Sequence, residues 1–432
     1  MADLQRIESV IDKLKAAKRS ERSDIIDDYH ELIKSGLTLE EGLRAIESSL
    51  EFPAPKYADE DNAEAMIGYL DTSRFPREHG VAAIPRILEL YPSLSERAQR
   101  ASIQLLMNIP EKEGAAAVME LVRRYFQDGK IPPSSFSLHA AHPSHADVYF
   151  PELLDYAQLT AWLEYAHSIW WICIKYCENG VLKPEQIISR SNSVAAEYRT
   201  LKTKLLPFQS QMERSKAFKY LVDREVAPLL LNLMRFFPTA EIKQELSLAL
   251  VEYRDPVLLC WASISALWLG LPVEHQIIET IAASDEARNT FYEKLKEHNR
   301  TSIFPEKYRT KAAFAQSDLV NWLTYPTELG CVPDAIELTD VIVEADEEGT
   351  RDWFLFRFRA SKSTFRGEID PTVWLAGWSG PFPNDSAPGD VLNPGDHISN
   401  FEPWDSKTPE EHLRAFYGTA LGNLRANNRE SG

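Results

Sequence analysis

The sequence predicts a mainly α protein, in which a long helical-repeat domain precedes a small C-terminal α+β domain. Three observations support this fold class. Helical segments punctuated by proline recur along most of the chain, one helix is apolar on several faces, and helical periodicity changes to strand-like alternation near Pro326. We therefore expect an all-α domain over 1–325, and an α+β domain with antiparallel strands and a terminal helix over 326–432.

The composition is that of a globular protein with a large acidic excess. Of 432 residues, 44% are hydrophobic, and the formal net charge is −18. This charge opposes binding to nucleic-acid phosphates and to anionic membranes, so we expect neither as a partner. The charged start of the chain lacks the apolar core of a secretory signal, and four cysteines suit reduced thiols. Together these features predict a cytoplasmic protein.

Three helices are expected in the first fifty residues. Gly36 provides a stop for the second helix, and Thr38 with Glu41 three residues later forms a capping-box pattern that begins the third. The first helix is expected over 3–18 and the second over 23–35. Two further helices are expected before residue 91, over 62–71 and 82–90.

Two later blocks share one spacing of prolines. Pro92 and Pro110 are 18 residues apart, as are Pro238 and Pro256. In each block an aromatic-Pro pair is followed by a Ser or Thr expected to cap a helix, and the second proline begins an antiparallel partner helix. Such pairs need stacked neighbours to bury their apolar faces, which favours an α-solenoid. The alternative is an all-α bundle with proline-punctuated helices.

The helix expected over Asp255–Gly270 carries no charge between its ends. An apolar helix of this kind lies either in lipid or between other helices. Its length of about 14 residues gives roughly 21 Å, which is shorter than the ~30 Å of a bilayer core. With Pro256 in its first turn and Gly270 as its stop, a buried helix is favoured.

The middle of the chain and its end complete the expected elements. Gly129–Val148 is expected to be a loop, and helices are expected over 149–179, 184–207 and 210–236. After Pro326, alternation predicts strands at Ile336–Glu344, around Phe354–Phe358 and at Thr372–Trp378. The remaining expected features are a hairpin turn at Asp346–Gly349, a loop at Gly380–Gly395, and a last helix capped by Thr408 with Glu411.

Two resemblances follow from these segments. The Asp255-Pro256 helix with small residues Ala262 and Ala266 is similar to the second helix of a HEAT-type repeat, and Tyr91–Tyr125 resembles the same unit more loosely. That resemblance implies a HEAT-like α–α superhelix that binds proteins. The segments that contain Asp318–Leu323, Tyr325–Gly330, Phe354–Phe358 and Gly377–Phe382 resemble a module of bacterial helical-repeat proteins, some of which look like immunity proteins against toxins.

Catalytic and metal-binding signatures are weak. The sequence contains no phosphate-binding loop, dinucleotide fingerprint or zinc-protease motif. Gly377-Trp378-Ser379-Gly380 lacks the helix that a nucleophile elbow requires, so a tight turn is favoured. The sharpest metal candidates, His139, His142 and His145, lie in a proline-interrupted segment, where a solvated loop is favoured over a metal site. We expect no catalytic residue, cofactor or metal.

The most prominent polar and aromatic set lies in the C-terminal domain. Arginine and tryptophan are enriched at binding hot spots, which suggests a partner-binding surface. The favoured alternative is that the tryptophans form the core of a small sheet and the arginines pair with an acidic neighbouring strand. The set comprises Arg357, Arg359, Arg366, Trp374, Trp378 and Trp404.

Three functions are consistent with this sequence. The leading hypothesis is a non-enzymatic protein-binding protein, in its narrower form an immunity protein that sequesters a basic toxin, since complementary charge speeds encounter. The first alternative is an intracellular scaffold or regulator. The second is a hydrolase or lyase with acidic residues and histidine in a cleft. The sequence does not indicate an oligomeric state.

Overall fold

A computed structural model of the 432-residue chain gives its fold. The chain forms two compact units, the first from 1–204 and 225–242 and the second from 205–224 and 243–432. The prediction of a boundary at residue 326 stays a prediction. The structure describes residues 4–52, 61–130, 143–158, 163–208, 218–325, 327–346, 349–363, 367–383, 388, 396–412 and 414–415.

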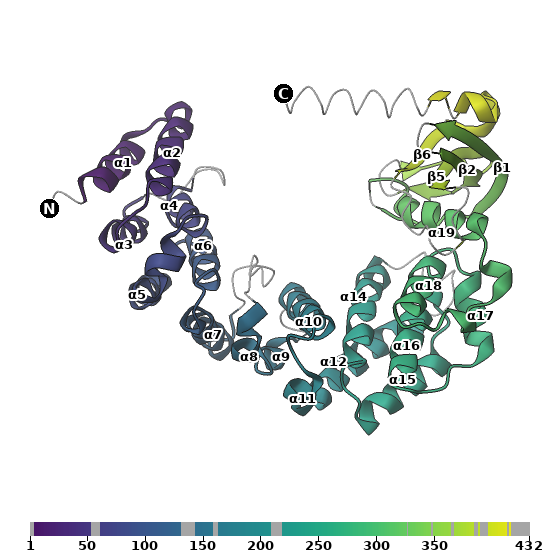
Figure 1. The fold of residues 1–432 in the computed structure, drawn as a ribbon, viewed down its shortest axis with the longest axis horizontal. Coiled ribbons are helices and arrows are strands. Elements are labelled where there is room, and N and C mark those ends of the chain that lie inside the picture. Colours follow the sequence, from purple (N-terminus) through teal and green to yellow (C-terminus); the bar gives the residue numbers. More distant parts are fainter. Residues whose placement is uncertain are drawn as a thin grey trace. The chain divides into compact units, whose positions relative to one another are not determined.

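The N-terminal part of the first unit is a stack of helices in two layers (Figure 1). Helices α1, α3, α5 and α7 contact one another in sequence in one layer, and α2, α4 and α6 do so in the other. Each helix therefore packs on the equivalent helix of the next pair, as in a repeat array. Their bounds are α1 Gln5–Ala16, α2 Arg19–Lys34, α3 Leu39–Ser48, α4 Asn62–Asp71, α5 Phe75–Leu90, α6 Glu96–Met107 and α7 Lys112–Gln127.

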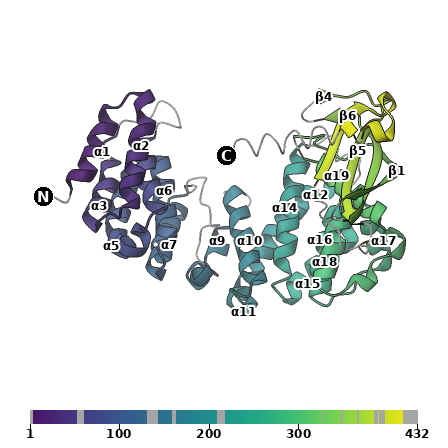
Figure 2. The same ribbon diagram turned by 45° about the horizontal axis from the view of Figure 1, so that its top comes forward.

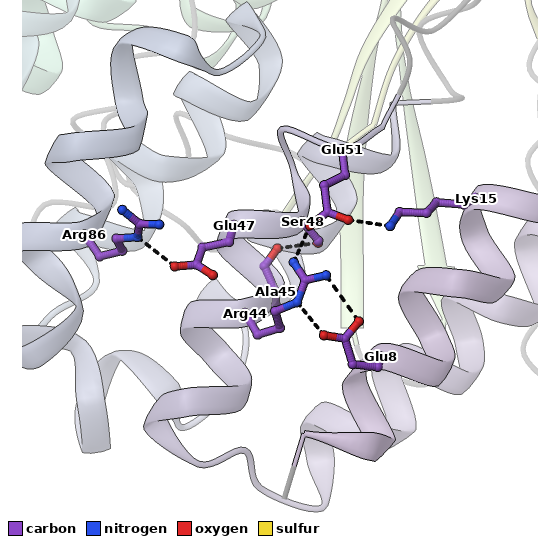
Figure 3. A network of polar contacts seen from close by, with 8 residues as sticks. All are labelled: Glu8, Lys15, Arg44, Ala45, Glu47, Ser48, Glu51 and Arg86. Atoms are coloured by element: carbon purple, nitrogen blue, oxygen red, sulfur yellow. Dashed lines mark hydrogen bonds and ion pairs between the residues drawn. The ribbon is translucent and has the colours of Figure 1, made fainter. Parts of the chain in front are cut away.

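Ion pairs connect helices of the same layer. Arg44 of α3 donates to Glu8 of α1 at 2.6 Å and to Glu51 at 2.5 Å, and Lys15 of α1 also pairs with Glu51 (Figure 3). On the other side of α3, Glu47 accepts from Arg86 of α5 at 2.7 Å. Arg44 and Glu8 are 36 residues apart and Arg86 and Glu47 are 39 apart, about one helix pair, so these contacts join each pair to the next.

Helix ends confirm some predicted caps and correct others. Thr38 accepts from the Glu41 amide while Glu41 accepts from the Thr38 amide, which confirms the capping box. The N-cap of α6 is Ser95, so the expectation that the residue after Pro92 caps this helix was wrong. Helix α5 also begins earlier than expected, at Phe75, because Pro76 fits its first turn.

The first unit continues through three short helices, α8, α9 and α11, and three long ones, α10, α12 and α14; all but α8 are labelled in Figure 2. The expectation of a loop over 129–148 was wrong at its end, where α8 begins, while 131–142 lie outside the described residues. Part of α14 belongs to the second unit. The bounds are α8 Ala146–Tyr149, α9 Leu153–Tyr156, α10 Leu163–Glu178, α11 Pro184–Ile187, α12 Ser191–Leu205 and α14 Phe218–Met234.

The apolar helix α16 (Pro256–Trp268) lies in the second unit, where it packs against α17 (His275–Ala283) and α18 (Arg288–Glu297). Asp255 caps it by accepting from the Val257 amide at 3.0 Å, and Gly270 follows its end with a φ of +74°. Both predicted ends are therefore confirmed.

Burial of α16 is incomplete. Leu258, Cys260 and Ile264 are buried, whereas Trp268 is 46% exposed and packs edge-on against His298. Among the described residues, none of the helices combines the length and apolar character needed to cross a bilayer. The other helices of this part are α15 (Ala240–Glu252) and α19 (Lys311–Leu323).

A four-stranded antiparallel sheet in the order β1-β2-β5-β6 follows α19 (Figure 1). One face packs Phe354, Phe356 and Phe358 against Leu319 and other residues of α19, while the other face buries Leu355 with Trp353 and Trp378. The predicted alternation of this segment is thus confirmed. The four strands of this sheet are β1 Ala335–Asp346, β2 Gly349–Arg359, β5 Leu375–Pro383 and β6 Asp396–Pro403. A separate pair is formed by β3 Lys362–Ser363 and β4 Gly367–Glu368.

Strand β5 corrects two expectations. It starts at Leu375 rather than Thr372 and continues through Gly380 to Pro383, so the predicted tight turn and the start of the predicted loop are wrong. A Cβ on Gly377 would lie 2.9 Å from a Leu319 methyl and 3.2 Å from the Phe358 ring. Glycine therefore allows α19 to approach the sheet closely, a tertiary requirement that local turn propensity does not reveal.

Candidate protein-binding surface

Strand β1 lies at the edge of the sheet and pairs with β2 alone in the described part of the chain. Residues directly opposite each other in an antiparallel pair point to the same face. Ile336, Leu338 and Val341 oppose Phe358, Phe356 and Phe354, and therefore share the face that α19 covers.

A bulge at Thr339 maintains this arrangement. The register shifts between Leu338 and Asp340, so one extra residue lies in β1. Without it, strict alternation would turn Val341 and Val343 to the face opposite Leu338. The bulge thus gathers the apolar side chains of β1 on one face.

Part of this apolar face stays open to solvent. Leu338 is 42% exposed, Val341 40% and Val343 57%, although their neighbours on β2 are buried. We call these three residues the edge strip. Isolated exposed apolar residues are ordinary, but three along one unpaired edge form a template for another strand.

The opposite face carries a second feature beside the same edge. The Arg357 guanidinium lies 4.5 Å from the centroid of the Trp374 ring, and that of Arg359 lies 5.1 Å from it. Arg357 also donates to Glu337 of β1 at 2.6 Å. We call Arg357, Arg359 and Trp374 the arginine–tryptophan stack. Arg359 is exposed, and its cation is held in place by the aromatic ring.

Two other predicted binding residues, Trp378 and Trp404, do not join this stack. Trp378 is fully buried in the sheet core, and Trp404 is half-buried and stacks on His412 at 5.4 Å. Arg366 lies outside the described residues. The Arg357–Glu337 pair and the burial of Trp378 agree with the structural interpretation of those two residues, whereas Arg359 and Trp374 are placed on the surface.

The serine of the Gly-Trp-Ser-Gly segment is shielded from solvent. Ser379 is fully buried within β5, and its hydroxyl donates to Asp318 of α19 at 2.8 Å. This hydrogen bond joins helix to sheet. A buried hydroxyl without access to a substrate cannot act as a nucleophile.

The histidine segment gives no metal site in the part of the chain that the structure describes. His139 and His142 lie outside it, and His145 is buried with its Nε2 2.7 Å from the Pro110 carbonyl. Within the described ranges, no group of three or more His, Cys, Asp and Glu side chains is arranged to hold a metal ion.

From the sequence alone, the edge strip was not identified as a candidate binding site. Its signal is the slip in alternation from Ile336 and Leu338 to Val341 and Val343, with one extra polar residue between the pairs. That slip is typical of a bulge, but it does not indicate which strand lies at an edge.

Comparisons with known proteins add no relative. Neither protein-family models, nor curated proteins, nor solved structures match this chain.

Proposed function

We propose that this chain is a non-enzymatic protein-binding protein that adds an extended segment of its partner to strand β1. The observation that carries the proposal is the edge strip, three exposed apolar side chains along the outer edge of β1, which has no partner strand among the described residues. Proteins normally blunt such edges, because they invite pairing with other chains.

Strand addition would use both faces of the edge. Backbone groups of the added strand would pair with β1, and its side chains would point alternately to the two faces of the sheet. One set would contact Val341 and Val343, while the other would lie toward Glu337 and the arginine–tryptophan stack beside it. Strand addition would therefore use the exposed apolar residues on one face of the sheet and the Arg359 guanidinium on the other.

Charge favours a basic partner over a second copy of this chain. Glu337 and Asp340 are exposed on β1, and the whole chain carries −18. Two copies of β1 paired edge to edge would bring these carboxylates close to their own counterparts, which destabilises a sheet. A segment with lysine or arginine would instead meet opposite charge, which also speeds encounter.

The narrower form of the proposal is an immunity protein that sequesters a basic toxin in the cytoplasm. It rests on the resemblance of the C-terminal segments, on the HEAT-like appearance of the helix pairs, and on the acidic charge. A scaffold or regulator would use the same surface. A hydrolase or lyase with acidic residues and a histidine in a cleft stays the second alternative, and Ser379 lends it no support, because this serine is buried against Asp318.

A matched pair of lysine substitutions tests the binding edge. Val343→Lys adds a charge to the edge strip, whereas Val251→Lys adds the same charge at a 67% exposed position of α15. The full chain would be used to capture partners, and the captured protein would then be titrated against each variant. We expect Val343→Lys to weaken binding by about tenfold or more, or ~1.4 kcal/mol, and Val251→Lys to leave it unchanged.

Equal affinity of both variants for the recovered partner would contradict strand addition to β1. Recovery of a toxin whose activity is inhibited by the wild-type chain, but not by Val343→Lys, would support the immunity form. A recovered partner without toxic activity would support a scaffold or regulator instead.

A further inference from the structure

The first unit contains a pocket of about 670 Å³. It is lined by the C-terminal end of α2 and by two turns between helices of the stack. The turns are those between α4 and α5 and between α6 and α7. This volume falls within the range of roughly 300–1,000 Å³ that is usual for small-molecule sites. Its lining includes the apolar residues Ile33, Pro76, Met107 and Pro110 and the polar or charged residues His30, Lys34, Asp71, Thr72, Ser73, Arg74, Arg77 and Asn108.

Positive charge gathers in this pocket although the chain is strongly acidic. Arg74 and Arg77 are exposed, and within the described residues their side chains make no hydrogen bond or ion pair. Lys34 pairs with Glu31 one turn earlier, but both side chains are more than half exposed, so this pair is weak. Three cations thus face one cavity that is lined by a single carboxylate, Asp71, so positive charge is in excess there.

The position of the arginines on α5 is electrostatically unfavourable. Arg74 is the N-cap of α5, and Arg77 lies in its first turn together with one acidic residue, Glu78. The N-terminus of a helix carries partial positive charge and favours anions, so the positive charge of basic residues there is repelled by the helix dipole. The Arg74 side chain also caps no backbone amide of the helix. A bound anion would offset both the two cations and the helix end.

We propose that this pocket binds a small organic anion with at least two phosphate or carboxylate groups. Two or more anionic groups match three cations spread over α2 and α5. The exposed ring of Pro110 would pack against the carbon skeleton of the ligand. The site is separate from the protein-binding edge and does not depend on the function proposed for it.

Asp71 sets a limit on affinity within the same pocket. Its carboxylate accepts a hydrogen bond from Asn108, and burial raises its pKa above the ordinary value. When ionised, it repels a bound anion. Asp71→Asn keeps an oxygen acceptor for Asn108 while it removes the charge, so this variant should bind anions more tightly than the wild type.

Calorimetric titration of the full chain with pyrophosphate and with citrate tests the proposal. Arg77→Ala is compared with Arg414→Ala, which removes an exposed arginine that does not line this pocket. Loss of one charge-assisted hydrogen bond predicts about tenfold weaker binding for Arg77→Ala. We expect wild-type affinity for Arg414→Ala and tighter binding for Asp71→Asn, a gain that a misfolded variant could not show.

Saturable binding of pyrophosphate alone would support the site and assign phosphate chemistry, and binding of citrate alone would assign carboxylates. Absence of saturable binding by both anions would overturn the proposal. Equal weakening by Arg77→Ala and Arg414→Ala would also overturn it, because binding would then follow total charge rather than this pocket.

Discussion

The tryptophans of the C-terminal sheet differ in what covers them. Trp378 is fully buried beside Leu355, so its role is packing, while Trp374 lies half-buried under the two arginines. Alternation along β2 predicted that Arg357 and Arg359 share a face. It could not predict which tryptophan meets them, because that depends on how β5 pairs with β2.

Arg359 and Trp378 should therefore respond oppositely to substitution. We expect Arg359→Ala to weaken partner binding by about 1–2 kcal/mol while the free energy of unfolding changes by less than about 0.5 kcal/mol. Trp378→Ala should lower that free energy by about 3–5 kcal/mol through loss of buried contacts. Urea unfolding and a titration with the captured partner measure both quantities. Lower stability of Arg359→Ala with unchanged binding would show that its role is structural.

At the level of elements, local signals predicted helix ends better than strand ends. Thr38 with Glu41 and Asp255 with Pro256 are capping patterns that act within one turn, and both are found in the structure. The prolines after Gly380 suggested a loop, yet β5 continues through them. Pairing with β2 and β6 decides this segment, and such long-range pairing is invisible to local propensity.

The ion pairs between α1 and α3 predict a specific pH dependence. Hydrogen bonds from Arg44 and Lys15 lower the pKa of Glu51 from 4.5 to about 2. A lowered pKa means that this carboxylate stabilises the fold above pH 4.5 and that the contribution is lost as the pH falls toward 2. Because Glu51 is more than one-third exposed, the contribution is about 1 kcal/mol or less.

Urea unfolding of the wild type and of Glu51→Gln measures this contribution. The difference in unfolding free energy should be largest near pH 7 and should shrink between pH 4.5 and pH 2. A difference that stays constant over this range would mean that the substitution acts through packing rather than through charge.

For the whole molecule, composition and periodicity were enough to predict a mainly α chain with a small C-terminal sheet. The apolar helix that raised a membrane question is α16, which packs against α17 and α18. The surfaces proposed to bind ligands lie elsewhere. Both surfaces depend on long-range structure, namely which strand lies at the edge of the sheet and which turns line the same pocket. Local sequence patterns do not contain this information.

The central claim is that β1 is the site of partner binding, and hydrogen–deuterium exchange tests it most directly. In the complex with the captured partner, an added strand would protect amides of β1 from exchange, since it would pair with the open edge. We predict slower exchange in peptides from Ala335–Asp346 and unchanged exchange in those from Ala240–Glu252 of α15. Protection elsewhere, with exchange in β1 unchanged, would contradict the claim.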